Sequence, residues 1–85
     1  MLVLTANRHY ALRGVRPGAH LAAVVRRLRV EKPFHIGLNY WYLAPGKSST
    51  GVLKVRGGTV EEIGIADKAL TRNRRLAGRF LRSFF

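Results

Sequence analysis

Apolar residues follow a helical spacing at two places in this chain. Between residues 19 and 29 they recur at the i, i+3, i+4 and i+7 positions that give a helix one apolar stripe. These residues are Leu21, Val24, Val25 and Leu28. Pro17 and Gly18 lead into this predicted helix, and Pro33 ends it because proline lacks the N–H group that a helix needs. Over residues 70–84 apolar side chains gather on one side and arginines on the other, which predicts a second, amphipathic helix.

Between the two predicted helices the pattern alternates, as in strands. Residues 34–38 alternate large apolar with small or polar side chains, and residues 40–43 are rich in the aromatic residues that favour strands. Residues 52–56 and 59–65 predict two further strands. Gly57-Gly58 joins them and is typical of a two-residue hairpin turn, because both glycines accept positive φ.

The pattern therefore predicts one α+β domain spanning residues 1–85, with a helix, a three- to four-stranded antiparallel sheet and a C-terminal amphipathic helix. Both helices are expected on one face of the sheet. Residues 2–5 predict a short strand, although residues 1–13 as a whole are expected to be irregular or the remnant of a longer chain. One hydrophobic cluster is expected, formed by Leu21, Val24, Val25, Leu28, Trp41, Leu53, Val55, Ile63, Phe80 and Leu81.

Charge adds a candidate surface to this picture. Sixteen basic residues oppose four acidic ones, which gives a net charge of +12. A field of that sign attracts nucleic acid, anionic surfaces or an acidic protein, and the alternative is a soluble surface whose arginines are only compositional. The arginines predicted to face a polyanion or a partner lie on the two helices. They are Arg72, Arg75, Arg79, Arg82, Arg26 and Arg27.

Catalytic and metal-binding patterns are not evident in the sequence. The chain has no cysteine, which excludes disulfides and thiolate metal sites. His9, His20 and His35 have no ligand-like spacing, and Gly46-Lys47-Ser48 lacks the preceding glycine and the following helix of a phosphate loop. Glu61 and Glu62 are neighbours on a predicted strand, so they are expected to point to opposite faces. The sequence therefore predicts no enzyme, no cofactor and no small-molecule substrate.

Three consecutive aromatic residues form the other candidate. Trp41 is expected in the core, because the single tryptophan of so small a protein is usually buried. Tyr40 and Tyr42 share the opposite face of the strand, where they either form an exposed stacking platform for nucleic acid or are partly buried.

The order of these features resembles the repeat unit of the β-lactamase-inhibitor protein and of the small outer-membrane-assembly lipoproteins, the SmpA/OmlA (BamE-like) group. The matching residues are Gly14, Pro17, Gly18, Val24, Leu28, Trp41, Tyr42, Leu53, Val55, Gly57, Gly58, Val60 and Ile63. The chain is also similar to C-terminal domains of uncharacterised exported actinobacterial proteins. The resemblance implies helices on one face of an antiparallel sheet, a non-catalytic role and export.

Two functions follow as expectations. The first is a non-catalytic binding or structural module with a protein partner, which the resemblance would place at the C-terminus of an exported protein. The alternative is a nucleic-acid-binding protein that uses the arginine-rich surface, and it is favoured if the chain is complete and cytoplasmic. The oligomeric state is not predicted by any feature of the sequence.

Overall fold

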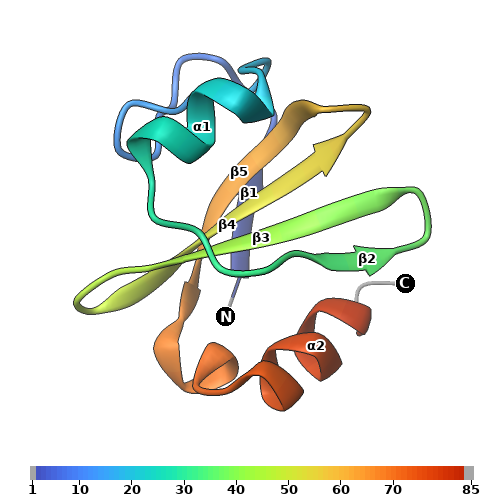
Figure 1. Ribbon diagram of the computed structural model, residues 1–85. Coiled ribbons are helices and arrows are strands. Elements are labelled where there is room, and N and C mark those ends of the chain that lie inside the picture. The colour runs from blue at the N-terminus through green and yellow to red at the C-terminus, as the bar shows by residue number, and fades with distance from the viewer. Residues whose placement is uncertain (1, 84–85) are drawn as a thin grey trace.

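The computed structural model describes residues 2–83, which form one five-stranded antiparallel sheet with a helix on either side (Figure 1). The strand order is β1-β5-β4-β3-β2. In chain order the elements are β1 (Leu2–Thr5), α1 (Leu21–Arg27), β2 (Phe34–Ile36), β3 (Asn39–Pro45), β4 (Ser49–Arg56), β5 (Thr59–Asp67), a 3₁₀ turn (Lys68–Thr71) and α2 (Arg74–Arg82).

The sheet is larger than the sequence predicts, so the expectation of a helix followed by three or four strands is wrong. The chain begins with β1, which lies at one edge of the sheet and pairs with β5, Val3 opposite Ile65. The short strand predicted at residues 2–5 is confirmed, so only part of the segment 1–13 is irregular. The partners of this pair are far apart in sequence, and a local hydrophobic pattern carries no information about such a pairing.

The helices lie on opposite faces of the sheet, not on one face as predicted (Figure 1). Val24 and Leu28, from α1 and its end, pack on one face, whereas Ala77 and Leu81 of α2 pack on the other. The strand residues of the α1 face are Ala44, Leu53, Val55, Val60 and Ile63. Those of the α2 face are Phe34, Trp41, Leu43, Val52 and Ala66.

The predicted single cluster is therefore two clusters. Successive strand residues point to opposite faces, so Val52 and Leu53, both 0% exposed, need a cover on each side of the sheet. A strand buried on both faces has a continuous apolar run in place of alternation. Val25, also predicted in the core, is half exposed, because Val24 and Leu28 already form the contact between α1 and the sheet.

Both helices are shorter than predicted. The backbone at the start of α1 forms hydrogen bonds to the sheet and not within the helix. Gly18 N–H donates to Val60 O at 2.7 Å, and Leu21 N–H donates to Gly58 O at 2.8 Å. These bonds join the start of α1 to the β4–β5 turn. At the other helix, Asn73 Oδ1 accepts from Leu76 N–H at 2.9 Å and caps the N-terminus. The predicted end at residue 84 lies outside the described residues.

Two turns use positive φ at both central residues. Gly57 and Gly58 have φ of 59° and 77°, which confirms the predicted hairpin turn. Arg13 and Gly14 form the other turn, with φ of 49° and 86°, inside the loop that packs beside α1. A non-glycine residue in this region costs about 1–2 kcal/mol, so the loop holds an arginine where asparagine or glycine would be less strained.

Candidate polyanion interface

The net charge is distributed unevenly along the chain. Residues 1–29 contain six arginines and no acidic residue, residues 30–67 contain four basic and four acidic residues, and residues 68–85 contain six basic residues and no acidic one. The first and last segments therefore carry the whole net charge of +12 in equal shares. The middle segment, which comprises most of the sheet, is neutral.

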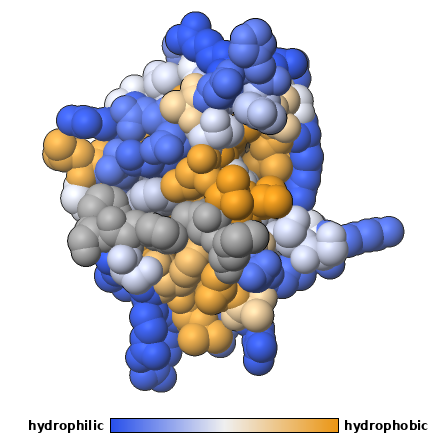
Figure 2. Space-filling model, turned by 180° about the vertical axis from the view of Figure 1, so that it is seen from behind, coloured by the Kyte–Doolittle hydropathy of each residue, from blue (hydrophilic) through white to orange (hydrophobic). Residues whose placement is uncertain are grey.

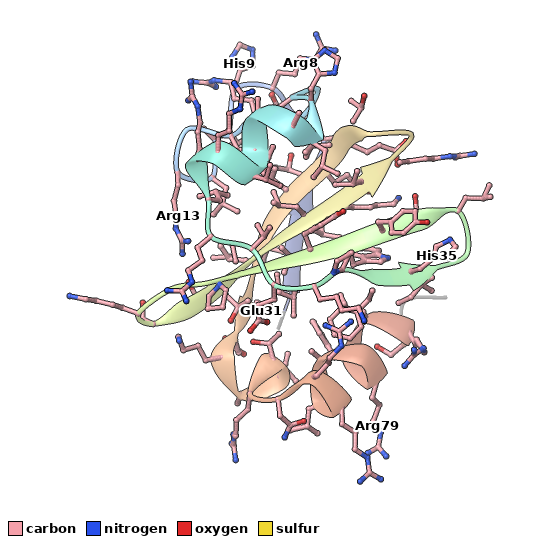
Figure 3. All side chains as sticks on the ribbon, viewed as in Figure 1. Arg8, His9, Arg13, Glu31, His35 and Arg79 are labelled. Atoms are coloured by element: carbon pink, nitrogen blue, oxygen red, sulfur yellow. The ribbon has the colours of Figure 1, made fainter. Side chains whose placement is uncertain are left out.

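The fold separates the two charged segments in space. The loop before α1 and α1 itself lie on one face of the sheet, and α2 lies on the other, so most of the arginines form two groups on opposite faces. Arg13 and Arg29 lie between these groups, Arg13 beside Gly46 at the tip of the β3–β4 hairpin and Arg29 beside Glu31 and Pro45. Figure 3 shows Arg8 at one end and Arg79 at the other. We name the first group the α1 pole, formed by Arg8, Arg16, Arg26 and Arg27. The α2 pole is formed by Lys68, Arg72, Arg74, Arg75, Arg79 and Arg82.

The six arginines predicted as one binding surface are all exposed, but the structure does not bring them together. Arg26 and Arg27 belong to the α1 pole, and the other four belong to the α2 pole. Sequence analysis missed the contribution of the loop, Arg8 and Arg16. Counting charge by segment would have revealed it, because no acidic residue precedes Glu31.

Arg74 has a structural role in the α2 pole. Its Nη1 donates to Lys32 O at 2.7 Å and its Nη2 to Pro33 O at 2.9 Å, while its guanidinium lies 4.0 Å from the centre of the Phe34 ring. These contacts tie α2 to the segment that enters β2, so replacing Arg74 would disturb the fold as well as the surface charge.

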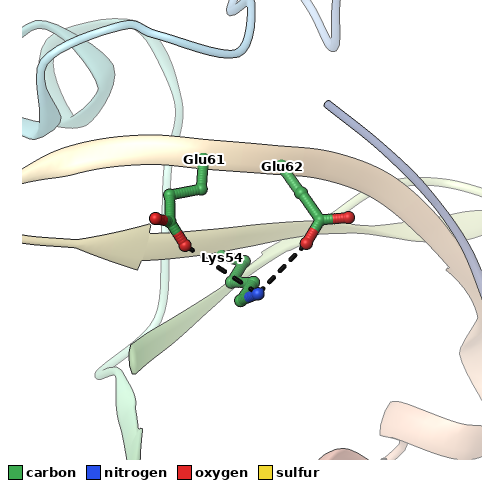
Figure 4. A network of polar contacts seen from close by, with 3 residues as sticks. All are labelled: Lys54, Glu61 and Glu62. Atoms are coloured by element: carbon green, nitrogen blue, oxygen red, sulfur yellow. Dashed lines mark hydrogen bonds and ion pairs between the residues drawn. The ribbon is translucent and has the colours of Figure 1, made fainter. Parts of the chain in front are cut away.

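Two glutamates of β5 share one lysine of the neighbouring strand (Figure 4). Lys54 Nζ lies 3.1 Å from Glu62 Oε2 and 3.8 Å from Glu61 Oε1. The expectation that the two glutamates point to opposite faces is wrong, because the strand register shifts between Lys54 and Val55 and a bulge lets neighbouring side chains turn the same way. The ion pairs of Glu61 and Glu62 are therefore with a lysine and not with an arginine.

One exposed aromatic pair lies on the α1 face of the sheet, near its β2 edge. The rings of Tyr40 and His35 are stacked, with centroids 4.3 Å apart and planes 2° apart, and Tyr40 is 41% exposed. Tyr42 is half-buried against the α1-face cluster, and Trp41 is buried as predicted. The predicted platform of two tyrosines is therefore a tyrosine–histidine pair. His35 was missed because its position opposite Tyr40 depends on the register of β2 and β3.

An apolar hollow of about 140 Å³ lies at the β1 edge of the sheet. Val3, Tyr10 and Ile65, which are among the most exposed large apolar side chains, line it. Figure 2 shows apolar residues across the middle of this side of the molecule, with hydrophilic residues above and below.

The remaining candidates show no catalytic geometry. Gly46-Lys47-Ser48 forms the tip of the β3–β4 hairpin, where Gly46 N–H donates to Ser49 O at 3.0 Å, and a strand follows it. A second hollow, of about 470 Å³, contains the Thr50 and Thr71 hydroxyls, which are hydrogen-bonded to each other at 2.7 Å.

In the described part of the chain no three His, Asp or Glu side chains converge as metal ligands. None of the described helices is long and apolar enough to cross a membrane.

Comparison with known proteins identified no relative of this chain. No family model, curated protein or solved structure matches the chain. The predicted relationship to the SmpA/OmlA group and to exported actinobacterial domains therefore stays a prediction, and helices on one face of the sheet, which that relationship implies, are not what this fold has.

Proposed function

We propose that this protein is a non-catalytic module that binds nucleic acid through its phosphate backbone, without sequence preference. The observation that carries the proposal is the distribution of charge: exposed arginines form two poles, and Glu61 and Glu62 of β5 are paired with Lys54 and not with these arginines. Arg16 and Arg74 donate hydrogen bonds to backbone carbonyls within the protein. An exposed arginine that makes no such bond contributes little to folding, but it releases counterions when it meets a phosphate.

The choice of arginine supports phosphate as the ligand. The chain has twelve arginines and four lysines. The planar guanidinium offers a fork of N–H donors that matches two phosphate oxygens, whereas the lysine ammonium is a point charge. The stacked pair His35–Tyr40 offers an aromatic face to a nucleobase, which would add a preference for single strands over duplexes.

A membrane surface fits the geometry less well. An amphipathic helix binds lipid by burying its apolar face in the interface between headgroups and acyl chains. In α2 that face is already used, because Ala77, Gly78 and Leu81 are buried on the sheet. Only the charged side of the helix is available, and it is suited to a hydrophilic polyanion.

The test is fluorescence anisotropy of a labelled oligonucleotide of mixed sequence, titrated with protein over a range of salt concentrations. We expect affinity to fall steeply with salt and to be similar for unrelated sequences. A six-site variant with Arg8, Arg26, Arg27, Arg75, Arg79 and Arg82 replaced by Gln should lose affinity by about 10–100-fold near physiological salt, and the log–log salt slope on single strands should become shallower by about 0.7 for each phosphate contact that is lost.

The control variant removes charge from the neutral segment instead. Lys32, Lys47 and Arg56 are exposed, and replacing each with Gln should leave the salt slope unchanged within error. An equal effect in this control would mean that net charge, and not the poles, sets the affinity. A sharp sequence preference, or affinity retained at high salt, would contradict backbone binding.

A protein partner is the alternative, and the apolar hollow favours it. Val3, Tyr10 and Ile65 are exposed together at an edge strand, where a protein could add both apolar contact and strand pairing. Replacing Val3 and Ile65 with Thr would weaken such a complex and leave nucleic-acid binding unchanged, so the two functions respond to different variants.

A further inference from the structure

We propose that the protein holds two nucleic-acid segments at once, one at each pole, and so acts as a bridge between them. This inference rests on the proposed function and adds a geometry to it. Its basis is the placement of two groups of exposed arginines on opposite faces of a sheet whose own segment, residues 30–67, has no net charge.

A rigid polyanion meets only one pole at a time. The Cα extents of the molecule are 29, 27 and 21 Å, whereas double-stranded DNA has a persistence length of about 500 Å. A short duplex seated on the arginines of α1 therefore does not bend around the sheet to reach those of α2. The second pole of a protein bound to one duplex stays available for another.

The thickness of the protein also separates the two bound segments. The Debye length is about 8 Å at physiological salt, so even the smallest extent of 21 Å exceeds two Debye lengths. Repulsion between the two segments is then largely screened, while each pole stays in direct contact with its own phosphates. A second segment therefore binds with little loss of affinity caused by the first.

The experiment uses two populations of a short duplex, one carrying a donor dye and one an acceptor, mixed with the full chain. Resonance energy transfer between them should rise as protein is added and then fall when excess protein occupies each duplex separately. Anisotropy of one labelled duplex, measured in the same buffer, reports binding without bridging.

Three variants, each lacking three charges, separate the poles. The α1-pole variant replaces Arg8, Arg26 and Arg27 with Gln, and the α2-pole variant replaces Arg75, Arg79 and Arg82 with Gln. Each should still bind one duplex with a loss of about twofold, the factor expected when one of two equivalent sites remains. Each should lose energy transfer. The variant of Lys32, Lys47 and Arg56 should keep both.

The outcomes distinguish bridging from nucleic-acid binding, the proposed function on which it rests. Binding of wild-type protein without energy transfer overturns the bridge and leaves the proposed function standing. Energy transfer that survives in either single-pole variant also overturns it, because bridging would then come from self-association through another surface. No binding by wild-type protein would remove the proposed function itself. Circular dichroism and a thermal melt establish that each variant is folded.

Discussion

The two helices both carry arginines on their exposed sides but are attached to the sheet in different ways. The seven residues of α1 contain one buried side chain, Val24, and its N-cap residue His20 makes no side-chain capping bond. The nine residues of α2 include three buried positions and begin at an Asn73 cap. Backbone hydrogen bonds to the β4–β5 turn hold the start of α1, whereas side chains, Arg74 among them, hold α2.

Two similar amphipathic sequence patterns can therefore give helices that are held to the sheet by different kinds of contact, backbone hydrogen bonds in one and side chains in the other. Backbone contacts survive most substitutions, but side-chain contacts do not. We therefore expect point substitutions to lower the free energy of unfolding more on the α2 side of the sheet than on the α1 side. Because only α1 lacks a side-chain cap, we expect a new N-cap to stabilise the protein there and not at α2.

The largest effect is expected beneath α2. Replacing Trp41 with Ala removes a side chain that is 2% exposed from the α2-face cluster. Loss of its burial and the resulting cavity should lower the free energy of unfolding by about 3–5 kcal/mol, most of the stability of a small domain. Chemical denaturation measures this change. Tyr40→Ala, at the neighbouring exposed position, is the matched control. A similar loss in both variants would contradict the burial of Trp41.

A smaller effect is expected on the α1 side. Leu28 lies at the end of α1 and is 5% exposed in the α1-face cluster. Leu28→Ala should cost about 2–3 kcal/mol, the low end of the range for such a truncation, since a side chain at a helix end can relax. Its denaturation midpoint should lie above that of Trp41→Ala. The reverse order would show that α1 is the better anchored helix.

The Asn73 cap tests the support of α2 directly. Asn73→Ala removes the acceptor of the Leu76 N–H and should destabilise the protein by about 1 kcal/mol. Thermal unfolding followed by circular dichroism measures it. Asn73→Ser keeps a capping oxygen and should recover most of the loss, whereas no recovery would assign the effect to something other than the cap.

The smallest change is expected at His20, and it is a gain. His20 is exposed and has the extended backbone of an N-cap, with φ −77° and ψ 139°, but its side chain makes no capping bond. His20→Ser supplies a hydroxyl acceptor for the first turn and should stabilise the protein by about 0.5 kcal/mol. The same change in melting temperature in His20→Ala would argue against capping as the cause.

Local features of the fold could be predicted from the sequence. The approximate position of each helix, the Gly57-Gly58 turn and the burial of Trp41 follow from spacing, backbone freedom and side-chain size. Each of these depends on residues close together in the chain.

The arrangement of layers could not be predicted in the same way. An apolar stripe on α1 and another on α2 show that each helix is covered, but not which face of the sheet covers it. The adjacent buried residues Val52 and Leu53 were the available indication that both faces are occupied. The pairing of β1 with β5, the bulge at Glu61 and the stacking of His35 on Tyr40 all depend on strand register.

The two poles determine how the molecule approaches a partner. Charges of the same sign on opposite faces give a large net charge with a smaller dipole moment than either pole alone would give. A distant polyanion therefore attracts the protein with little turning, and encounter is fast but weakly directed. Which helix makes contact is decided mainly on collision. Removing charge from one pole enlarges the dipole, so such a variant would arrive already oriented toward its remaining pole.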